Sequence, residues 1–140
     1  MSQVGKKFPD ISVNAMNEMA DTFKINVLQE ALENKKKIIL FWYPKDFTFV
    51  CPTEIHAFQS KLSEFEKRNT MVIGASCDTP EVHFAWLSTP KDNGGIEGVT
   101  FPLIADSTRH LSETLDILDT EYIGTEENYS IEGDNVSYRA

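Results

Sequence analysis

Cysteine is scarce in this chain, which has only Cys51 and Cys77. Two cysteines build neither a disulfide framework nor a cysteine-rich metal cluster. Long apolar runs are also missing, and the strongest one, Ile38–Tyr43, is far too short to span a bilayer. The opening residues 1–9 include two lysines but lead into no apolar run, so we expect no signal peptide and a cytoplasmic protein.

Positive charge is sparse as well. The chain has 13 Lys and Arg against 22 Asp and Glu, a formal net charge of -9. An acidic surface repels phosphate backbones and anionic lipids, so we expect neither a nucleic-acid nor a membrane partner. No Lys or Arg lies between Arg109 and Arg139. We therefore interpret about residues 119–134 as an acidic, solvated loop insertion.

Metal-ligand spacing is absent among the three histidines. His56, His83 and His110 stand far apart, which favours surface positions or packing on helices over ligation. We therefore expect these histidines not to bind a metal.

An ordinary globular composition fills the rest of the chain. Hydrophobic residues make up 41% and charged residues 25% of the 140 positions, which suits one domain, residues 1–140, with one core.

Strand and helix patterns alternate along this domain. Residues 8–19 indicate turns or a short hairpin, and Asn26 with Gln29 predicts a capped helix through about Asn34. Continuous apolar runs predict buried strands, and periodic runs behind Pro52 and Thr79 predict helices. The strands are expected at residues 38–43, 71–75 and 101–105, and the helices at about 52–66 and 79–88.

A last short helix with Leu111 and Leu115 is expected behind a Ser107 cap, and residues 135–140 resemble the start of a strand. This alternation predicts an α/β domain with parallel strand pairing. Cys51 then follows a central strand at its carboxyl end, where open α/β sheets place their sites.

The surroundings of Cys51 favour thiolate chemistry. A thiol becomes a strong nucleophile only when ionised, and a helix N-terminus favours negative charge through its unpaired N–H groups and dipole. Pro52 suits the first helical turn, and Thr48 lies on the same loop. The alternative is a buried structural cysteine, which is the commonest fate of a lone cysteine.

The motif Pro44-x-x-x-Thr48-x-x-Cys51 resembles the active site of peroxiredoxins. The longer run from Asp46 to Glu54 resembles the typical two-cysteine branch, which includes the peroxidase subunit of alkyl hydroperoxide reductase and the thiol-specific antioxidant proteins. The similarity continues through residues 74–78, 85–90 and 101–106 and covers about residues 8–118.

This resemblance implies a thioredoxin-like fold and a thiol-dependent peroxidase that reduces hydrogen peroxide and organic hydroperoxides. Cys51 would attack the peroxide and become a sulfenic acid, with no metal and no organic cofactor. Thr48 would hydrogen-bond the peroxide and the sulfur, and Pro44 would shield the site from water. The implied partners are a thiol reductant protein, either thioredoxin-like or a flavin disulfide reductase, and further copies of the chain in a homodimer or a ring of dimers.

The family also uses an arginine at the start of a later strand, and Arg139 matches that local pattern. Glu54 would orient it. The acidic insertion, around residues 122–135, places Arg139 further along the chain than the family pattern does. The alternative is a solvated, mobile terminal arginine.

The family pattern includes segments that do not occur here. It has an antiparallel strand pair and a final helix after the arginine, and a resolving cysteine in a C-terminal tail. Cys77 does not match that cysteine, and we expect it to be structural. We therefore expect a peroxiredoxin domain that is incomplete at its C-terminus, a truncated form of a longer peroxidase.

Two other functions compete with a peroxidase. A truncated, poorly active form would expose apolar surface and act as a chaperone-like holdase or interaction protein. A thioredoxin-type disulfide reductase would use Cys-x-x-Cys, but Glu54 stands where the second cysteine would be.

Overall fold

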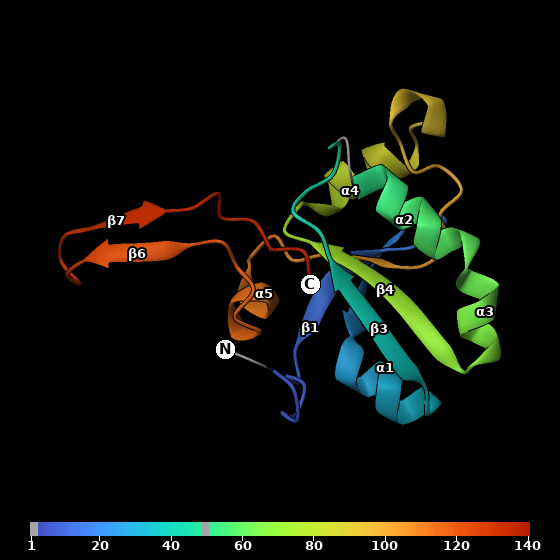
Figure 1. Ribbon diagram of the computed structural model, residues 1–140, viewed down its shortest axis with the longest axis horizontal. Helices are drawn as coiled ribbons and strands as arrows, with labels where there is room; N and C mark the ends of the chain where they lie inside the picture. The colour runs from blue at the N-terminus through green and yellow to red at the C-terminus, as the bar shows by residue number, and fades with distance from the viewer. Residues whose placement is uncertain (1–2, 49–50) are drawn as a thin grey trace.

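The fold is built on a five-stranded mixed sheet with helices on both faces (Figure 1). The computed structural model describes residues 3–48 and 51–140, without the side chain of Cys51. The strand order is β2-β1-β5-β4-β3. The hairpin β1–β2 and the pair β1–β5 are antiparallel, whereas β5–β4 and β4–β3 are parallel. The predicted α/β class is therefore confirmed.

Most elements lie near their predicted positions. The first half has β1 (Ser12–Met16), β2 (Thr22–Asn26), α1 (Val27–Asn34), β3 (Lys37–Trp42), α2 (Cys51–Ser60) and α3 (Leu62–Lys67). The second half has β4 (Thr70–Ser76), α4 (Pro80–Leu87), a 3-10 turn (Lys91–Asn93), β5 (Leu103–Ala105), α5 (His110–Thr114), β6 (Glu121–Gly124) and β7 (Tyr129–Glu132). The helix predicted over about 52–66 is interrupted at Lys61, which separates α2 from α3.

Two helix starts follow from local side-chain contacts. The Asn26 side chain accepts a hydrogen bond from the Gln29 amide, and the Thr79 hydroxyl accepts one from the Val82 amide. Both contacts satisfy amides that have no partner inside the helix. The two predicted caps are confirmed.

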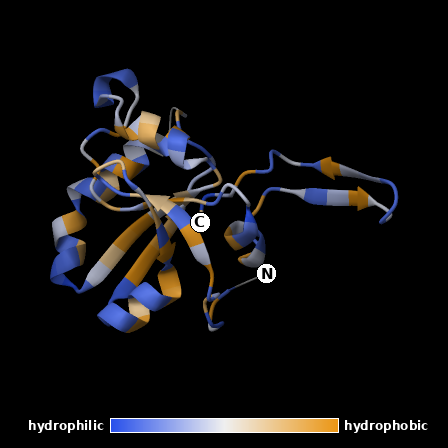
Figure 2. Cartoon of the chain, turned by 180° about the vertical axis from the view of Figure 1, so that it is seen from behind, coloured by the Kyte–Doolittle hydropathy of each residue, from blue (hydrophilic) through white to orange (hydrophobic). Residues whose placement is uncertain are grey.

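Alternate residues of β3, β4 and β5 pack on opposite faces of the sheet. Trp42, Ile73 and Ile104 contribute to one core cluster, beside Val27 of α1 and Leu111 of α5. Phe41, Val72 and Leu103 contribute to the other cluster, beside Ile55 of α2 and Trp86 of α4. This period of two explains why the strand sequences are almost wholly apolar, since both faces are covered. Figure 2 shows hydrophobic residues along these strands.

The position of β3 differs from the prediction of a central strand. It lies at the end of the described sheet order, with only β4 as a neighbouring strand. Beyond it, Ala140 exchanges backbone hydrogen bonds with Trp42, with N···O distances of 2.7 and 3.3 Å. Residues 135–140 were expected to start a strand, but Ser137 makes only an isolated bridge, to Leu118.

The acidic segment also differs from the expected loop. Strands β6 and β7 pair in an antiparallel hairpin that extends away from the rest of the molecule (Figure 1). All residues of both strands are exposed, so the expectation of a solvated segment holds. Tyr122 and Tyr129 pack together across the hairpin with ring centroids 5.6 Å apart. This contact and the paired backbone explain why strands form despite the acidic composition.

The start of α5 is held by Asp106 and not by Ser107. The buried Asp106 carboxylate accepts hydrogen bonds from the amides of Leu111 and Ser112, at 3.2 and 2.8 Å. A carboxylate with two amide donors is a stronger cap than a hydroxyl with one.

We predict that Asp106→Ala lowers the free energy of unfolding by about 1–3 kcal/mol, because two buried amides lose their acceptor. Ser107→Ala is the matched control and should change it by less than about 0.5 kcal/mol. Urea unfolding of the two variants measures both values. Equal losses would show that α5 does not depend on the Asp106 contacts.

Candidate functional site

The loop between β3 and α2 holds two of the predicted site residues and leads to a third. Pro44 and Thr48 are half-buried on this loop, and α2 begins at Cys51. The Thr48 hydroxyl donates a long hydrogen bond, 3.5 Å, to the carbonyl of Lys45. Residues 49–50 and the Cys51 side chain lie outside the described residues, so the predicted contact between Thr48 and the sulfur stays a prediction.

The helix start at Cys51 creates a favourable place for negative charge. Pro52 occupies the first turn and is buried, which agrees with the preference of proline for this position. The first amides of α2 point towards the loop, and the helix dipole adds positive potential at the same end. An anionic group at residue 51 therefore lies at the electrostatically preferred end of the helix.

Arg139 and Glu54 are brought together from 85 residues apart. The Arg139 Nε donates to Glu54 Oε1 at 2.8 Å, and the two side chains are 47% and 35% exposed. Glu54 belongs to the first turn of α2. The guanidinium is therefore held beside the same helix start as Cys51, which is the contact that the family resemblance implies.

The segment that carries Arg139 is attached to the end of β3. The Ser137 hydroxyl donates to the carbonyl of Tyr43 at 2.9 Å, and the Tyr138 amide donates to the carbonyl of Ile117 at 2.8 Å. Ala140 pairs with Trp42, as described above. Arg139 therefore lies between Tyr138 and Ala140, which are both held by backbone hydrogen bonds. Its backbone is more ordered than that of a solvated terminal arginine.

The acidic hairpin does not displace this segment. The Asp119 amide donates to the carbonyl of Val136 at 2.8 Å, and the Asn135 amide donates to the carbonyl of Asp119 at 2.9 Å. The hairpin is therefore closed at its base, and the chain returns to the point where it left. This closure explains how Arg139 reaches Glu54 although the hairpin lies between them in the sequence.

A buried polar pair fixes the middle of the loop. His83 Nδ1 lies 2.6 Å from Asp46 Oδ2, and both side chains are fully buried. The Tyr43 hydroxyl donates to the other carboxylate oxygen of Asp46 at 2.8 Å. The loop is thereby joined to α4, which carries His83, and to the end of β3.

Two further elements complete this network. The backbone amide of Asp46 donates to Asp78 Oδ2 at 2.9 Å, and the same oxygen accepts from the Ser76 hydroxyl at 2.7 Å. His83 Nε2 lies 2.9 Å from the carbonyl of Ile104 in β5. Among the described residues, no buried side-chain nitrogen or oxygen lacks a hydrogen-bond partner.

Burial and mutual contact change the ionisation of these groups. Burial raises the pKa of the Asp46 carboxyl, and the bond to His83 offsets part of that rise. Burial alone would lower the pKa of His83, but the hydrogen bond and charge of Asp46 outweigh it, so the His83 pKa is raised. Burial, followed by the Asp46 charge, raises the pKa of Tyr43 well above 10.0. The pair therefore retains a proton to higher pH than isolated groups would.

The sequence did not identify Asp46 and His83 as functional, and His83 was expected on the surface or in helix packing. His83 lies three positions before the buried Trp86 on α4, which places both side chains on one helix face. The three-residue spacing from Trp86 was the sequence feature that could have predicted the burial of His83. Its partner Asp46 is 37 positions away, so the pairing itself left no local pattern.

Trp86 and Phe47 pack beside this network through ring contacts. Trp86 is fully buried and its ring contacts those of Tyr43 and Phe47, with centroids 5.8 and 5.9 Å apart. Phe47 is 53% exposed and has a φ of 59°, a left-handed conformation that is uncommon for a bulky side chain. The loop thus bends sharply just after Asp46.

Cys77 occupies a structural environment. It is 5% exposed, and its sulfur lies 3.5 Å from the Ser112 hydroxyl. Burial raises the pKa of the Cys77 thiol, which opposes ionisation. These surroundings agree with the expectation of a structural cysteine.

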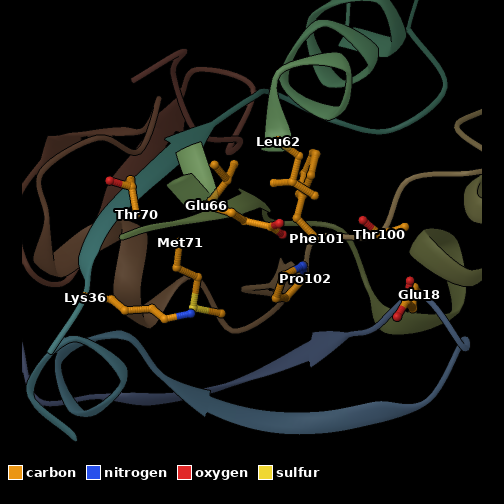
Figure 3. Close-up of a pocket in the computed structure, with 10 residues that line it drawn as sticks. Glu18, Lys36, Leu62, Glu66, Thr70, Met71, Thr100, Phe101 and Pro102 are labelled. Carbon is orange, nitrogen blue, oxygen red and sulfur yellow. The ribbon is translucent and has the colours of Figure 1, made fainter. Parts of the chain in front are cut away.

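A pocket of about 340 Å³ lies elsewhere on the molecule (Figure 3). Lys36, Thr70 and Met71 line it near the amino ends of β3 and β4, together with Phe101 and Pro102. None of the predicted site residues lines it. Within residues 3–48 and 51–140, no three His, Cys, Asp or Glu side chains are placed to hold a metal ion, and no described helix is long and apolar enough to cross a membrane.

We predict that the stability contributed by the Asp46–His83 pair is lost as the pH rises above 6.5. A raised histidine pKa gives stability that is fully present below its ordinary value of 6.5 and declines as pH rises through the folded-state pKa. Over that window the free energy of unfolding should fall by up to about 1.4 kcal/mol per pH unit, relative to the Asp46→Asn variant. Urea unfolding at a series of pH values measures this difference. A difference that stays constant with pH would contradict the raised pKa.

Comparisons with known proteins agree with this geometry. The model of the AhpC/TSA family matches residues 4–139. Alkyl hydroperoxide reductase C of Helicobacter pylori is 46% identical over 123 residues, which are 86% of this chain and 60% of that protein. The chloroplastic 2-Cys peroxiredoxin BAS1 of Spinacia oleracea is 45% identical over 115 residues, which are 82% of this chain and 42% of that protein. The chain thus spans about 60% or less of the length of these two relatives.

Solved structures share the fold over nearly the whole chain. The reduced 2-Cys peroxiredoxin of Plasmodium vivax has a TM-score of 0.82 and 33% identity, with 99% of this chain and 76% of that chain covered. Enterococcus faecalis AhpC has a TM-score of 0.76 and 25% identity, with 99% of this chain and 86% of that chain covered. The thioredoxin-like fold and the resemblance to peroxiredoxins are confirmed, and the chain belongs to the AhpC/TSA family.

Proposed function

We propose that this chain is a thiol-dependent peroxidase that reduces hydrogen peroxide and organic hydroperoxides through Cys51. The observation that carries the proposal is the ion pair between Arg139 and Glu54 at the first turn of α2, the helix that begins at Cys51. A guanidinium beside a helix N-terminus is suited to stabilising a thiolate and the negative charge that develops on a peroxide oxygen.

The reaction consumes the thiolate, the peroxide and one proton from the solvent. The Cys51 sulfur attacks one peroxide oxygen, the S–O bond forms as the O–O bond breaks, and the sulfur becomes a sulfenic acid. The second oxygen leaves with the bonding electrons and takes a proton, giving water or an alcohol. Thr48 hydrogen-bonds the peroxide and the sulfur, Pro44 limits the access of water, and Arg139 stabilises the charge on oxygen.

The curated relatives support the substrate class. The Helicobacter pylori relative is named an alkyl hydroperoxide reductase and the Spinacia oleracea relative a 2-Cys peroxiredoxin. We propose the same class of substrate here, with a thiol protein as reductant, either thioredoxin-like or a flavin disulfide reductase. A homodimer or ring of dimers, in the cytoplasm, belongs to the same proposal. These relatives favour a peroxidase over the holdase or interaction protein considered from the sequence.

Peroxide consumption with a small dithiol as reductant tests the activity directly. The dithiol reduces the sulfenic acid back to a thiol, releasing water and a cyclic disulfide, so turnover does not need a resolving cysteine. We expect Cys51→Ser to abolish consumption and Cys77→Ser to retain it. Consumption that survives Cys51→Ser would contradict the proposed function.

The ion pair should matter for reactivity and little for stability. Because both side chains are half-exposed, Glu54→Ala should lower the free energy of unfolding by no more than about 1 kcal/mol. It should slow peroxide oxidation of Cys51 about ten- to hundredfold, because Arg139 loses its orientation. Arg139→Ala should slow it by about a hundred- to a thousandfold.

Glu64→Ala is a matched control for Glu54→Ala. Glu64 forms an exposed ion pair with Arg68 at 3.0 Å on α3. Its removal should cost similar stability and leave the oxidation rate unchanged. Equal oxidation rates for Glu54→Ala and Glu64→Ala would show that the Arg139 contact has no role in the reaction.

A further inference from the structure

The loop that precedes Cys51 is anchored at one residue, Asp46. This residue lies two positions after Pro44 and two before Thr48, so it stands between two predicted site residues. Its two carboxylate oxygens contact His83 and Tyr43, and its amide contacts Asp78. Asp46 is buried, whereas Lys45 and Phe47 on either side of it are exposed. The side chain therefore fixes a segment that its neighbours leave on the surface.

The hydrogen-bond chemistry of His83 requires one shared proton. The carbonyl of Ile104 only accepts, so Nε2 must carry a hydrogen to bond it at 2.9 Å. The 2.6 Å contact between Nδ1 and Asp46 Oδ2 then needs a second proton, which resides on either atom. Without that proton, two lone pairs face each other in a buried site, or His83 changes tautomer and loses the Ile104 contact.

The groups around this proton come from three strands or their ends, β3, β4 and β5. Tyr43 at the end of β3 donates to Asp46, and Asp78 after β4 accepts from the Asp46 amide. The β5 strand contributes only the carbonyl of Ile104. Among the described groups that face the pair, Asp78 adds negative charge and none adds positive charge. The surroundings therefore favour retention of the proton.

Tyr43 links the anchored loop to the segment that carries Arg139. Its hydroxyl contacts Asp46, and its carbonyl accepts the hydrogen bond from Ser137, two residues before Arg139. Its amide donates to the carbonyl of Ala75 in β4 at 3.0 Å. One residue is thus common to the loop that leads to Cys51 and the segment that supplies the guanidinium.

We propose that Asp46 and His83 are positioning residues for the peroxidatic loop, and that the proton they share keeps the loop in its reactive arrangement. The inference rests on the proposed function. In this proposal both residues act through the placement of Thr48 and of the start of α2. Loss of the shared proton loosens the loop and slows the reaction of Cys51 in alkaline solution.

Two variants of Asp46 separate positioning from general stability. In Asp46→Asn the amide oxygen still accepts from Tyr43, and the amide nitrogen donates to Nδ1 of a neutral His83 that keeps its bond to Ile104. This variant needs no shared proton. Asp46→Ala removes both side-chain contacts and leaves His83 with an unsatisfied buried nitrogen.

The experiment measures single-turnover oxidation of Cys51 by hydrogen peroxide across a pH series, with Cys77→Ser as the background. Trp86 fluorescence is a suitable signal because its ring contacts Phe47 on the loop. We expect the rate in the background protein to rise as Cys51 ionises and then to fall in alkaline solution. The Asp46→Asn variant should react with hydrogen peroxide at the same rate as the background protein at neutral pH. Its rate should not decrease in alkaline solution. Asp46→Ala should be about a hundredfold slower where it folds.

Alkylation of Cys51 by iodoacetamide, over the same pH series, separates this inference from the proposed function. Alkylation needs the thiolate and the loop but no peroxide chemistry. Slow oxidation of Cys51 in the background protein would contradict the peroxidase. If alkylation of the same protein still slows in alkaline solution, and alkylation of the Asp46→Asn variant does not, the positioning role is supported. The same alkaline behaviour in the background protein and in Asp46→Asn, for both reactions, would overturn the positioning role. That comparison decides the question even where Asp46→Ala fails to fold.

Discussion

The buried contact between Asp46 and His83 is the constraint on which the candidate site depends. The loop after β3 carries residues of ordinary loop character, and several of them are exposed. What gives this loop a defined course is one carboxylate that reaches into the protein and meets groups from β3, α4 and the end of β4. Removing water from these groups is costly, and the network offsets the cost because each polar atom has a partner.

The second constraint acts from the other end of the chain. Ser137, Tyr138 and Ala140 attach the last residues to the end of β3 and to Ile117. The hairpin β6–β7 lies between α5 and this attachment but is closed at its base, so its length does not affect where Arg139 lies. Figure 1 shows the result, with the hairpin extended from the molecule and the C-terminus back beside the sheet. Arg139 therefore meets α2 through contacts that are independent of the hairpin's own sequence.

The parts of the fold that were predictable rest on contacts close in sequence. Asn26 and Thr79 cap helices through amides three positions away, and the strands β3, β4 and β5 are largely apolar because both of their faces are covered. The predictions were wrong where contacts between residues further apart in the sequence determine the local structure. Asp106 caps α5 from five and six positions away, and the hairpin forms through pairing of Tyr122 and Tyr129 within an acidic composition.

The site divides in the same way. The motif around Cys51 and the match of Arg139 to the family pattern indicated the Arg139–Glu54 contact before its geometry was known, because a family pattern carries information about distant contacts. His83 carried no such signal, and only the fold places it against Asp46. Burial of a charged pair could not be inferred from residues 37 positions apart, since each alone is typical of a surface position.

The central claim is that the folded loop and Arg139 activate Cys51. The most direct test compares two rate constants for oxidation by one equivalent of hydrogen peroxide: that of the Cys77→Ser chain and that of a synthetic peptide with the sequence of residues 44–54. The account predicts that the folded chain reacts orders of magnitude faster than the peptide, because only the fold supplies the guanidinium, the helix and the anchored loop. Equal rate constants would contradict it, since Cys51 would then behave as an ordinary thiol.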